Sequence, residues 1–134
     1  MEEVDLCLVM DCTGSMRPHI EGAKNSIKKV VDYMASMEPA IKIRVGFCGY
    51  RDHCLGANRL QIFDFINSCD EFKNLISEVA ATGGDGPKDV LGGLNAAVTR
   101  MAWRNRTRVL LHIRHMAVVS PISLTIIRAA IQMV

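Results

Sequence analysis

The chain has 134 residues, which suits one small domain, and 49% of them are apolar, enough to form a packed core. Aromatic residues make up only 5%, so the core must be mainly aliphatic, as in a parallel sheet covered by helices. The net charge of +2 comes with no basic face that would indicate nucleic-acid binding. The longest apolar run is interrupted by Pro121 and Arg128 and is too short to span a membrane.

The cysteines indicate a reducing, cytoplasmic setting. There are five, an odd number, and none form a Cys-x-x-Cys pair. Cys7 and Cys48 fall in predicted strands, where a thiol packs as a small apolar group. The N-terminus is acidic and leads directly into a strand, which is unlike a secretory signal.

The first half of the chain predicts a strand, a helix and two further strands. Residues 4–10 form an apolar run typical of a buried strand, and residues 12–17 form a turn-rich loop. Pro18 suits the first turn of the following helix, because its missing N–H costs nothing there. Residues 41–49 alternate as in a strand, and residues 60–66 predict a third strand that could pair antiparallel with the second.

The second half predicts two helices and a strand. Residues 71–79 form a short helix, and residues 81–88 a loop rich in glycine. Asp89 is expected to cap the next helix, and residues 108–113 form another buried strand. The residues of this last helix expected to face inward are Val90, Leu91, Leu94, Ala97, Val98 and Met101. The order β-α-β-β-α-α-β predicts an α/β fold with a mostly parallel sheet and helices on both faces.

The residues with most chemical potential follow the first strand. Asp11, Thr13 and Ser15 occupy alternate positions, so their side chains can turn three oxygens toward one point. Hard oxygen donors of this kind suit Mg²⁺. Gly14 allows the tight backbone path between them. In open α/β sheets, ligands bind at this edge, beyond the carboxyl ends of the strands.

A second loop carries further candidate ligands. Thr82 could reach the same metal ion from the side, while Asp85 and Asp89 supply negative charge nearby. A simpler alternative is a loop that caps a helix without any metal, because Asp, Thr and Ser are favoured capping residues. Spacing alone leaves both interpretations open.

Several longer motifs point to one family. The segment 11–16, Asp-Cys-Thr-Gly-Ser-Met, resembles the metal-ion-dependent adhesion site of von Willebrand factor type A (vWA) domains. The run 45–53, Val-Gly-Phe-Cys-Gly-Tyr-Arg-Asp-His, and segments 81–84 and 89–94 are similar to the vWA domain of alpha-type protein kinases. The resemblance covers residues 3–113 and implies a three-layer, vWA or Rossmann-like fold.

The resemblance also implies a function. It makes Asp11, Thr13, Ser15 and Thr82 ligands of Mg²⁺ or Mn²⁺, with Asp85 as a further candidate. The metal would bind an acidic side chain of a protein partner, with no nucleic acid or membrane involved. We therefore expect a binding module that is not an enzyme. One alternative is a regulatory or targeting fragment of an alpha-type serine/threonine kinase, and a second is a non-functional truncated fragment.

The sequence departs from the family in three respects. Lys88 stands where the family has an acidic residue, and the glycine loop is one residue shorter than usual. Residues 114–116, Arg-His-Met, replace a segment that carries the remaining site carboxylate, which predicts weakened metal binding. Codons allowed for residues 115–134, read in a shifted frame, can encode a family-like continuation. The expected organisation is thus a partial vWA-like domain, incomplete at the C-terminus, over residues 1–113 and an aberrant, frame-shifted tail over 114–134.

Other suggestive residues are assigned structural roles. Asp52, His53 and Cys54 lack the spacing of a zinc site, and the glycine loop lacks the Lys-Ser/Thr ending of a phosphate-binding loop. His112 is expected to be a hydrogen-bonded core histidine. A solvated face is expected for the basic cluster made of Arg100, Arg104, Arg106 and Arg108.

Overall fold

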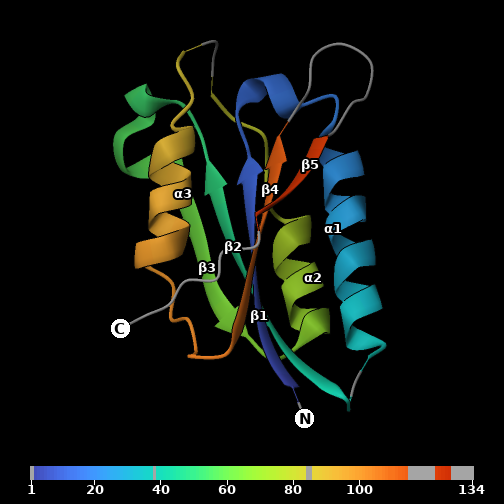
Figure 1. The fold of residues 1–134 in the computed structure, drawn as a ribbon. Helices are drawn as coiled ribbons and strands as arrows, with labels where there is room; N and C mark the ends of the chain where they lie inside the picture. Colours follow the sequence, from blue (N-terminus) through green and yellow to red (C-terminus); the bar gives the residue numbers. More distant parts are fainter. Residues whose placement is uncertain (1, 38, 84–85, 115–122, 128–134) are drawn as a thin grey trace.

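A computed structural model of the chain describes residues 2–37, 39–83, 86–114 and 123–127. One twisted sheet runs through the middle of the molecule, with helices on both sides (Figure 1). The predicted elements are all present, and their type and order are confirmed. The strands are β1 (Glu2–Asp11), β2 (Ile41–Tyr50), β3 (Leu60–Ile66), β4 (Thr107–Arg114) and β5 (Ser123–Ile127), and the helices are α1 (Ile20–Ala35), α2 (Cys69–Ser77) and α3 (Val90–Thr99).

The sheet is mostly parallel, as predicted. Its strand order is β3-β2-β1-β4-β5, with β1 paired in parallel to both β2 and β4. The edge strands β3 and β5 are antiparallel to their neighbours. The β2–β3 pairing agrees with the prediction, whereas β5 was not anticipated. The tail predicted over 114–134 otherwise falls on 115–122 and 128–134, which lie outside the described residues.

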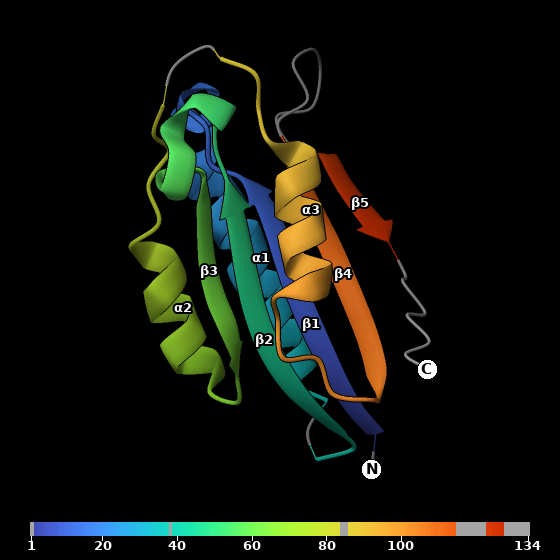
Figure 2. The same ribbon diagram turned by 90° about the vertical axis from the view of Figure 1, so that its left-hand side faces the viewer.

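The two faces of β1 supply two separate cores. Leu6, Leu8 and Met10 belong to the core that α1 and α2 cover, while Cys7 and Val9 belong to the core that α3 covers. Figure 2 shows α3 and α1 on opposite faces of the sheet. This follows from the strand period of two, because neighbouring side chains point to opposite faces. Burying an aliphatic side chain of this size contributes about 1.5–3 kcal/mol, so β1 anchors both layers.

The helix α1 begins two residues later than Pro18 suggests. A short 3-10 helix, η1 (Gly14–Met16), and a turn precede it, and Pro18 lies in that turn. Ile20, Ile27 and Val31 are buried against the sheet, as their helical spacing predicts. The loop after β1 is therefore held at both ends, by the central strand and by a packed helix.

The inward face of α3 was only partly predicted. Leu91 is 80% exposed and Val98 is 42% exposed, so the expectation that they face the core was wrong. Ala97 is buried as predicted, and the small residues Gly93 and Ala96 are buried beside it. A side-chain carbon at Gly93 would lie 2.8 Å from the ring of Tyr50, so the helix sits too close to the sheet for larger residues there.

The expectation for His112 was correct. It is buried, and its Nε2 shares a hydrogen bond of 2.8 Å with the hydroxyl of Tyr50, also buried. This contact joins β4 to β2 across the face that α3 covers.

The arginine cluster is less solvated than expected. Asp5 is fully buried and accepts hydrogen bonds from Arg44 at 2.7 and 2.9 Å and from Arg104 at 2.6 and 2.9 Å. Burial alone would raise the pKa of Asp5, but these hydrogen bonds outweigh it and lower the pKa. Arg108 is also buried and donates to the carbonyl of Arg104. The sequence pattern could not indicate these contacts, because Asp5 is a hundred residues away from the cluster.

Within the described ranges, no helix has the length and apolar character needed to cross a membrane.

Candidate metal centre

The candidate site lies at the carboxyl end of the central strand. Asp11 is the last residue of β1, and its side chain is almost fully buried. From β1 the chain passes through α1 to β2 on one side, while β4 lies on the other side. Such a change of direction leaves a crevice beyond the strand ends, which is the usual ligand site of open α/β sheets.

Three oxygen-bearing side chains converge there, as the spacing predicts. The backbone N and the Oγ1 of Thr13 both donate to Asp11 Oδ1, at 2.9 and 2.6 Å. Thr13 Oγ1 lies 2.9 Å from Ser15 Oγ. Thr13 is fully buried, whereas Ser15 is exposed. The linked side chains of Asp11, Thr13 and Ser15 therefore lead from the interior of the protein to its surface.

The second loop closes beside the first one. The backbone N–H of Thr82 donates to the carbonyl of Cys12 at 3.0 Å. A side chain at Gly14 would collide with the carbonyl oxygen of Gly83, so the backbones of the two loops are in close contact there. Gly83 has a φ of +108°, which favours glycine. Among the described residues, no hydrogen bond joins the Thr82 hydroxyl to the oxygens of the first loop, and Asp85 lies outside those residues.

The cation at this site comes from the chain itself. Lys88 Nζ donates to Asp11 Oδ2 at 2.9 Å, and the Lys88 side chain is 37% exposed. The backbone of Lys88 pairs with that of Asp52 in an isolated antiparallel β-bridge. Hydrogen bonds from His53 N to Pro87 O (2.9 Å) and from Asp89 N to Arg51 O (3.0 Å) hold the residues on either side. The sequence signal was a lysine where the family has an acidic residue; its position on Asp11 was not predicted.

The candidate ligands are all oxygen atoms, which suit a hard divalent cation, but they carry little negative charge. It offers one carboxylate and the hydroxyls of Thr13, Ser15 and Thr82. The described part of the chain holds no group of three or more His, Cys, Asp or Glu side chains that could bind a metal. Both oxygens of Asp11 are already hydrogen-bonded, so a cation has to displace the Lys88 ammonium to reach Oδ2.

The other acidic and thiol groups near the loops have structural roles. Asp89 caps α3 by accepting from Gly92 N and also accepts from Arg59 Nε at 2.9 Å. Burial opposes these hydrogen bonds, yet the net effect lowers the pKa of Asp89. Burial raises the pKa of Cys12 to about 12, so its thiol stays protonated and serves in packing. His53 lies 3.5 Å from Asp89 and belongs to the same surface contact.

Comparisons with known proteins give a relative and a fold. No protein family model matches the chain. The chain is 43% identical over 114 residues to the alpha-protein kinase vwkA of Dictyostelium discoideum. The alignment covers 84% of this chain but only 18% of that protein, so the chain spans less than a fifth of its relative's length.

Two solved structures share the fold. The proximal thread matrix protein 1 of the mussel byssus, solved with a zinc-occupied MIDAS motif, matches with a TM-score of 0.59 and 20% identity over 83% of this chain and 28% of its own. The adhesive tip pilin GBS104 of Group B Streptococcus agalactiae matches with a TM-score of 0.52 and 12% identity over 85% of this chain and 47% of its own. The chain is therefore related over most of its length to part of an alpha-protein kinase and shares the fold of von Willebrand factor type A domains.

Proposed function

We propose that this domain binds a protein partner through a divalent cation, Mg²⁺ or Mn²⁺, held by Asp11, Thr13, Ser15 and Thr82. The observation that carries the proposal is the convergence of Asp11, Thr13 and Ser15 oxygens over distances of 2.6–2.9 Å at the end of the central strand. When bound, the cation would supply a positive charge, and an acidic side chain of the partner would complete its coordination shell.

Each residue of the chain has a distinct part in this proposal. Asp11 supplies the negative charge, and its burial together with the two hydrogen bonds from Thr13 fixes its orientation. Ser15 is exposed and marks the side from which a partner approaches. Thr82 is brought next to the first loop by its backbone contact with Cys12. Asp85 is a further candidate ligand that lies outside the described residues.

Calorimetric titration of the chain with MgCl₂ and MnCl₂ tests the proposal. We expect saturable binding to the wild type and its loss in Asp11→Asn, which removes the carboxylate charge without removing its volume. Asp32→Asn is the matched control, because Asp32 is an exposed aspartate on α1. Binding that survives in Asp11→Asn, or that Asp32→Asn abolishes equally, would show that the ion binds elsewhere.

We also propose that the chain is the regulatory or targeting part of an alpha-type serine/threonine kinase and contributes binding, not catalysis. The 43% identity to an alpha-protein kinase supports this second function. The chain alone is then expected to show no phosphoryl transfer from ATP. The transcript across the codons for residues 111–116 should continue in the family's frame, into the missing carboxylate. If the transcript instead encodes the sequence as given, this result favours a domain boundary near residue 113 and the alternative of a truncated, non-functional fragment. A cooperative unfolding transition of the chain would contradict that alternative.

A cytoplasmic location fits the same proposal. The described cysteines are all free thiols, and three of them, Cys7, Cys12 and Cys48, are buried. Free thiols persist in reducing compartments.

A further inference from the structure

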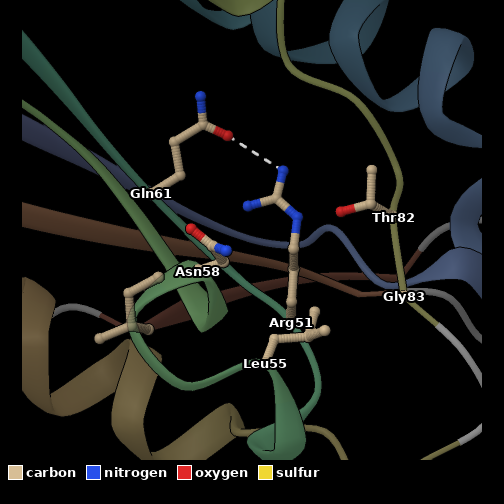
Figure 3. A pocket seen from close by; sticks show the side chains of 7 residues that line it. Arg51, Leu55, Asn58, Gln61, Thr82 and Gly83 are labelled. Atoms are coloured by element: carbon tan, nitrogen blue, oxygen red, sulfur yellow. Dashed lines mark hydrogen bonds between the residues drawn. The ribbon is translucent and has the colours of Figure 1, made fainter.

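A pocket of about 440 Å³ opens beside the candidate metal centre. Figure 3 shows the guanidinium of Arg51 inside it, between Gln61 on one side and Thr82 on the other. The lining residues are Arg51, Leu55, Asn58, Leu60, Gln61, Thr82 and Gly83. Among the described residues, the lining therefore combines one cation, several neutral polar groups and two leucines, with no acidic side chain.

The guanidinium of Arg51 is only partly satisfied by the protein. Arg51 is 7% exposed, and its Nη2 donates to Gln61 Oε1 at 3.0 Å and to the carbonyl of Ala80 at 2.9 Å. Nε is buried without a hydrogen-bond partner, and no described residue accepts a hydrogen bond from Nη1. A buried cation with unused donors is costly, because desolvation is not offset. Arg51 is thus fixed by Nη2, whereas Nη1 is left without a hydrogen-bond partner among the described residues.

We infer that this pocket binds a carboxylate, the acidic side chain of a protein partner, through Arg51 and without a metal ion. A guanidinium presents planar, fixed donors that match a carboxylate, and a charge-assisted hydrogen bond is about twice as strong as a neutral one. The amide of Asn58 and the hydroxyl of Thr82 add donors at the walls, and Figure 3 shows the Thr82 oxygen directed toward Arg51. Leu55 and Leu60 suit the methylene groups of an Asp or Glu side chain.

The described carboxylates near the pocket, Asp52 and Asp11, do not pair with Arg51. Asp52 is fully buried and packs against Gly83 and Gly86, and it does not line the pocket. Asp11 is neutralised by Lys88. The inference does not depend on the proposed metal site, because Arg51 supplies the positive charge itself.

An NMR titration in EDTA tests the inference with the full chain. The probe is the aspartate derivative N-acetyl-Asp-N-methylamide, and its asparagine analogue is the matched control compound. We expect saturable shifts at the Arg51 Nε–H and at the backbone amides of Thr82 and Gly83 with the aspartate probe alone. Equal shifts with both compounds would overturn the inference. Because EDTA removes divalent ions, the result is separate from the fate of the metal proposal.

Variants locate the site. Arg51→Gln should weaken the probe's affinity at least tenfold, whereas Arg17→Gln, which removes an exposed guanidinium near Gly83, should change it less than twofold. If Arg51→Gln unfolds the chain, Asn58→Glu still decides, because Asn58 is exposed and the new carboxylate should compete for Arg51. Asn95→Glu on α3 adds the same charge away from the pocket. Unchanged affinity in Asn58→Glu, or equal losses in Arg17→Gln and Arg51→Gln, would refute the carboxylate site.

Discussion

Replacing Lys88 by methionine should strengthen divalent cation binding at Asp11. The Lys88 ammonium donates to Asp11 Oδ2 at 2.9 Å, and a cation that binds this oxygen must first break that contact. A hydrogen bond to a charged group contributes about 1.5–3 kcal/mol. Lys88 is 37% exposed, so solvent screening favours the lower end of this range. A difference of about 1.4 kcal/mol is tenfold in affinity, and we expect Lys88→Met to bind Mn²⁺ about ten times more tightly.

The same substitution should lower stability without metal and restore it with metal. Thermal unfolding in EDTA should show Lys88→Met less stable than the wild type by about 1.5 kcal/mol, because Asp11 Oδ2 loses its partner. Saturating Mn²⁺ should close this gap, because tenfold tighter binding stabilises Lys88→Met by about 1.4 kcal/mol more than the wild type. Lys42→Met is the control, since Lys42 is an exposed lysine on β2. Equal Mn²⁺ affinities in the wild type, Lys88→Met and Lys42→Met would refute the competition between ammonium and metal.

Three further predictions concern the scaffold and can be checked by chemical denaturation. Asp5→Asn should cost about 3 kcal/mol, because it removes the charge of a fully buried carboxylate that pairs with two partly buried guanidinium groups. The pKa of Asp5 is lowered in the fold, so this gap should be complete above the unfolded pKa near 4 and shrink as the pH falls through the folded value; a gap independent of pH would count against the ion pair. Asp89→Ala should cost about 1 kcal/mol by removing the cap on Gly92 N, and an unchanged midpoint would show that the cap is unimportant. Leu91→Lys should change stability by less than about 0.5 kcal/mol, whereas Ile76→Ala costs about 3 kcal/mol; comparable losses would mean that Leu91 is covered.

Local patterns explain which parts of the fold the sequence predicted. The apolar run of β1 and the alternation of β2 depend only on neighbouring residues, and both strands were assigned within a few residues of their ends. The error at α3 has a nonlocal cause. The ring of Tyr50 limits how close the helix can come, so small residues face the sheet and Leu91 and Val98 turn outward. Helical periodicity alone cannot distinguish a face of small residues from a face of large ones when both contain apolar groups.

In the candidate site, too, contacts between residues close in sequence were predicted and contacts between distant residues were not. Asp11, Thr13 and Ser15 lie within five residues, so their convergence follows from the strand end and the turn, and spacing was enough to predict it. Lys88 reaches Asp11 across 77 positions, and Arg51 reaches Ala80 across 29. Such contacts depend on how the loops pack beyond the sheet, and residue type and spacing carry no direct signal of them.

The backbone pairing between residues 51–53 and 87–89 has a consequence for any experiment on this edge of the molecule. One short piece of chain carries Arg51, which faces the pocket, and the segment paired with it carries Lys88, which faces Asp11. The positions of the two cations thus depend on the same backbone pairing. A substitution that disturbs this pairing moves both positive charges together, whereas side-chain truncation changes one at a time. Only variants of the second kind can assign an effect on anion or metal binding to one of the two residues.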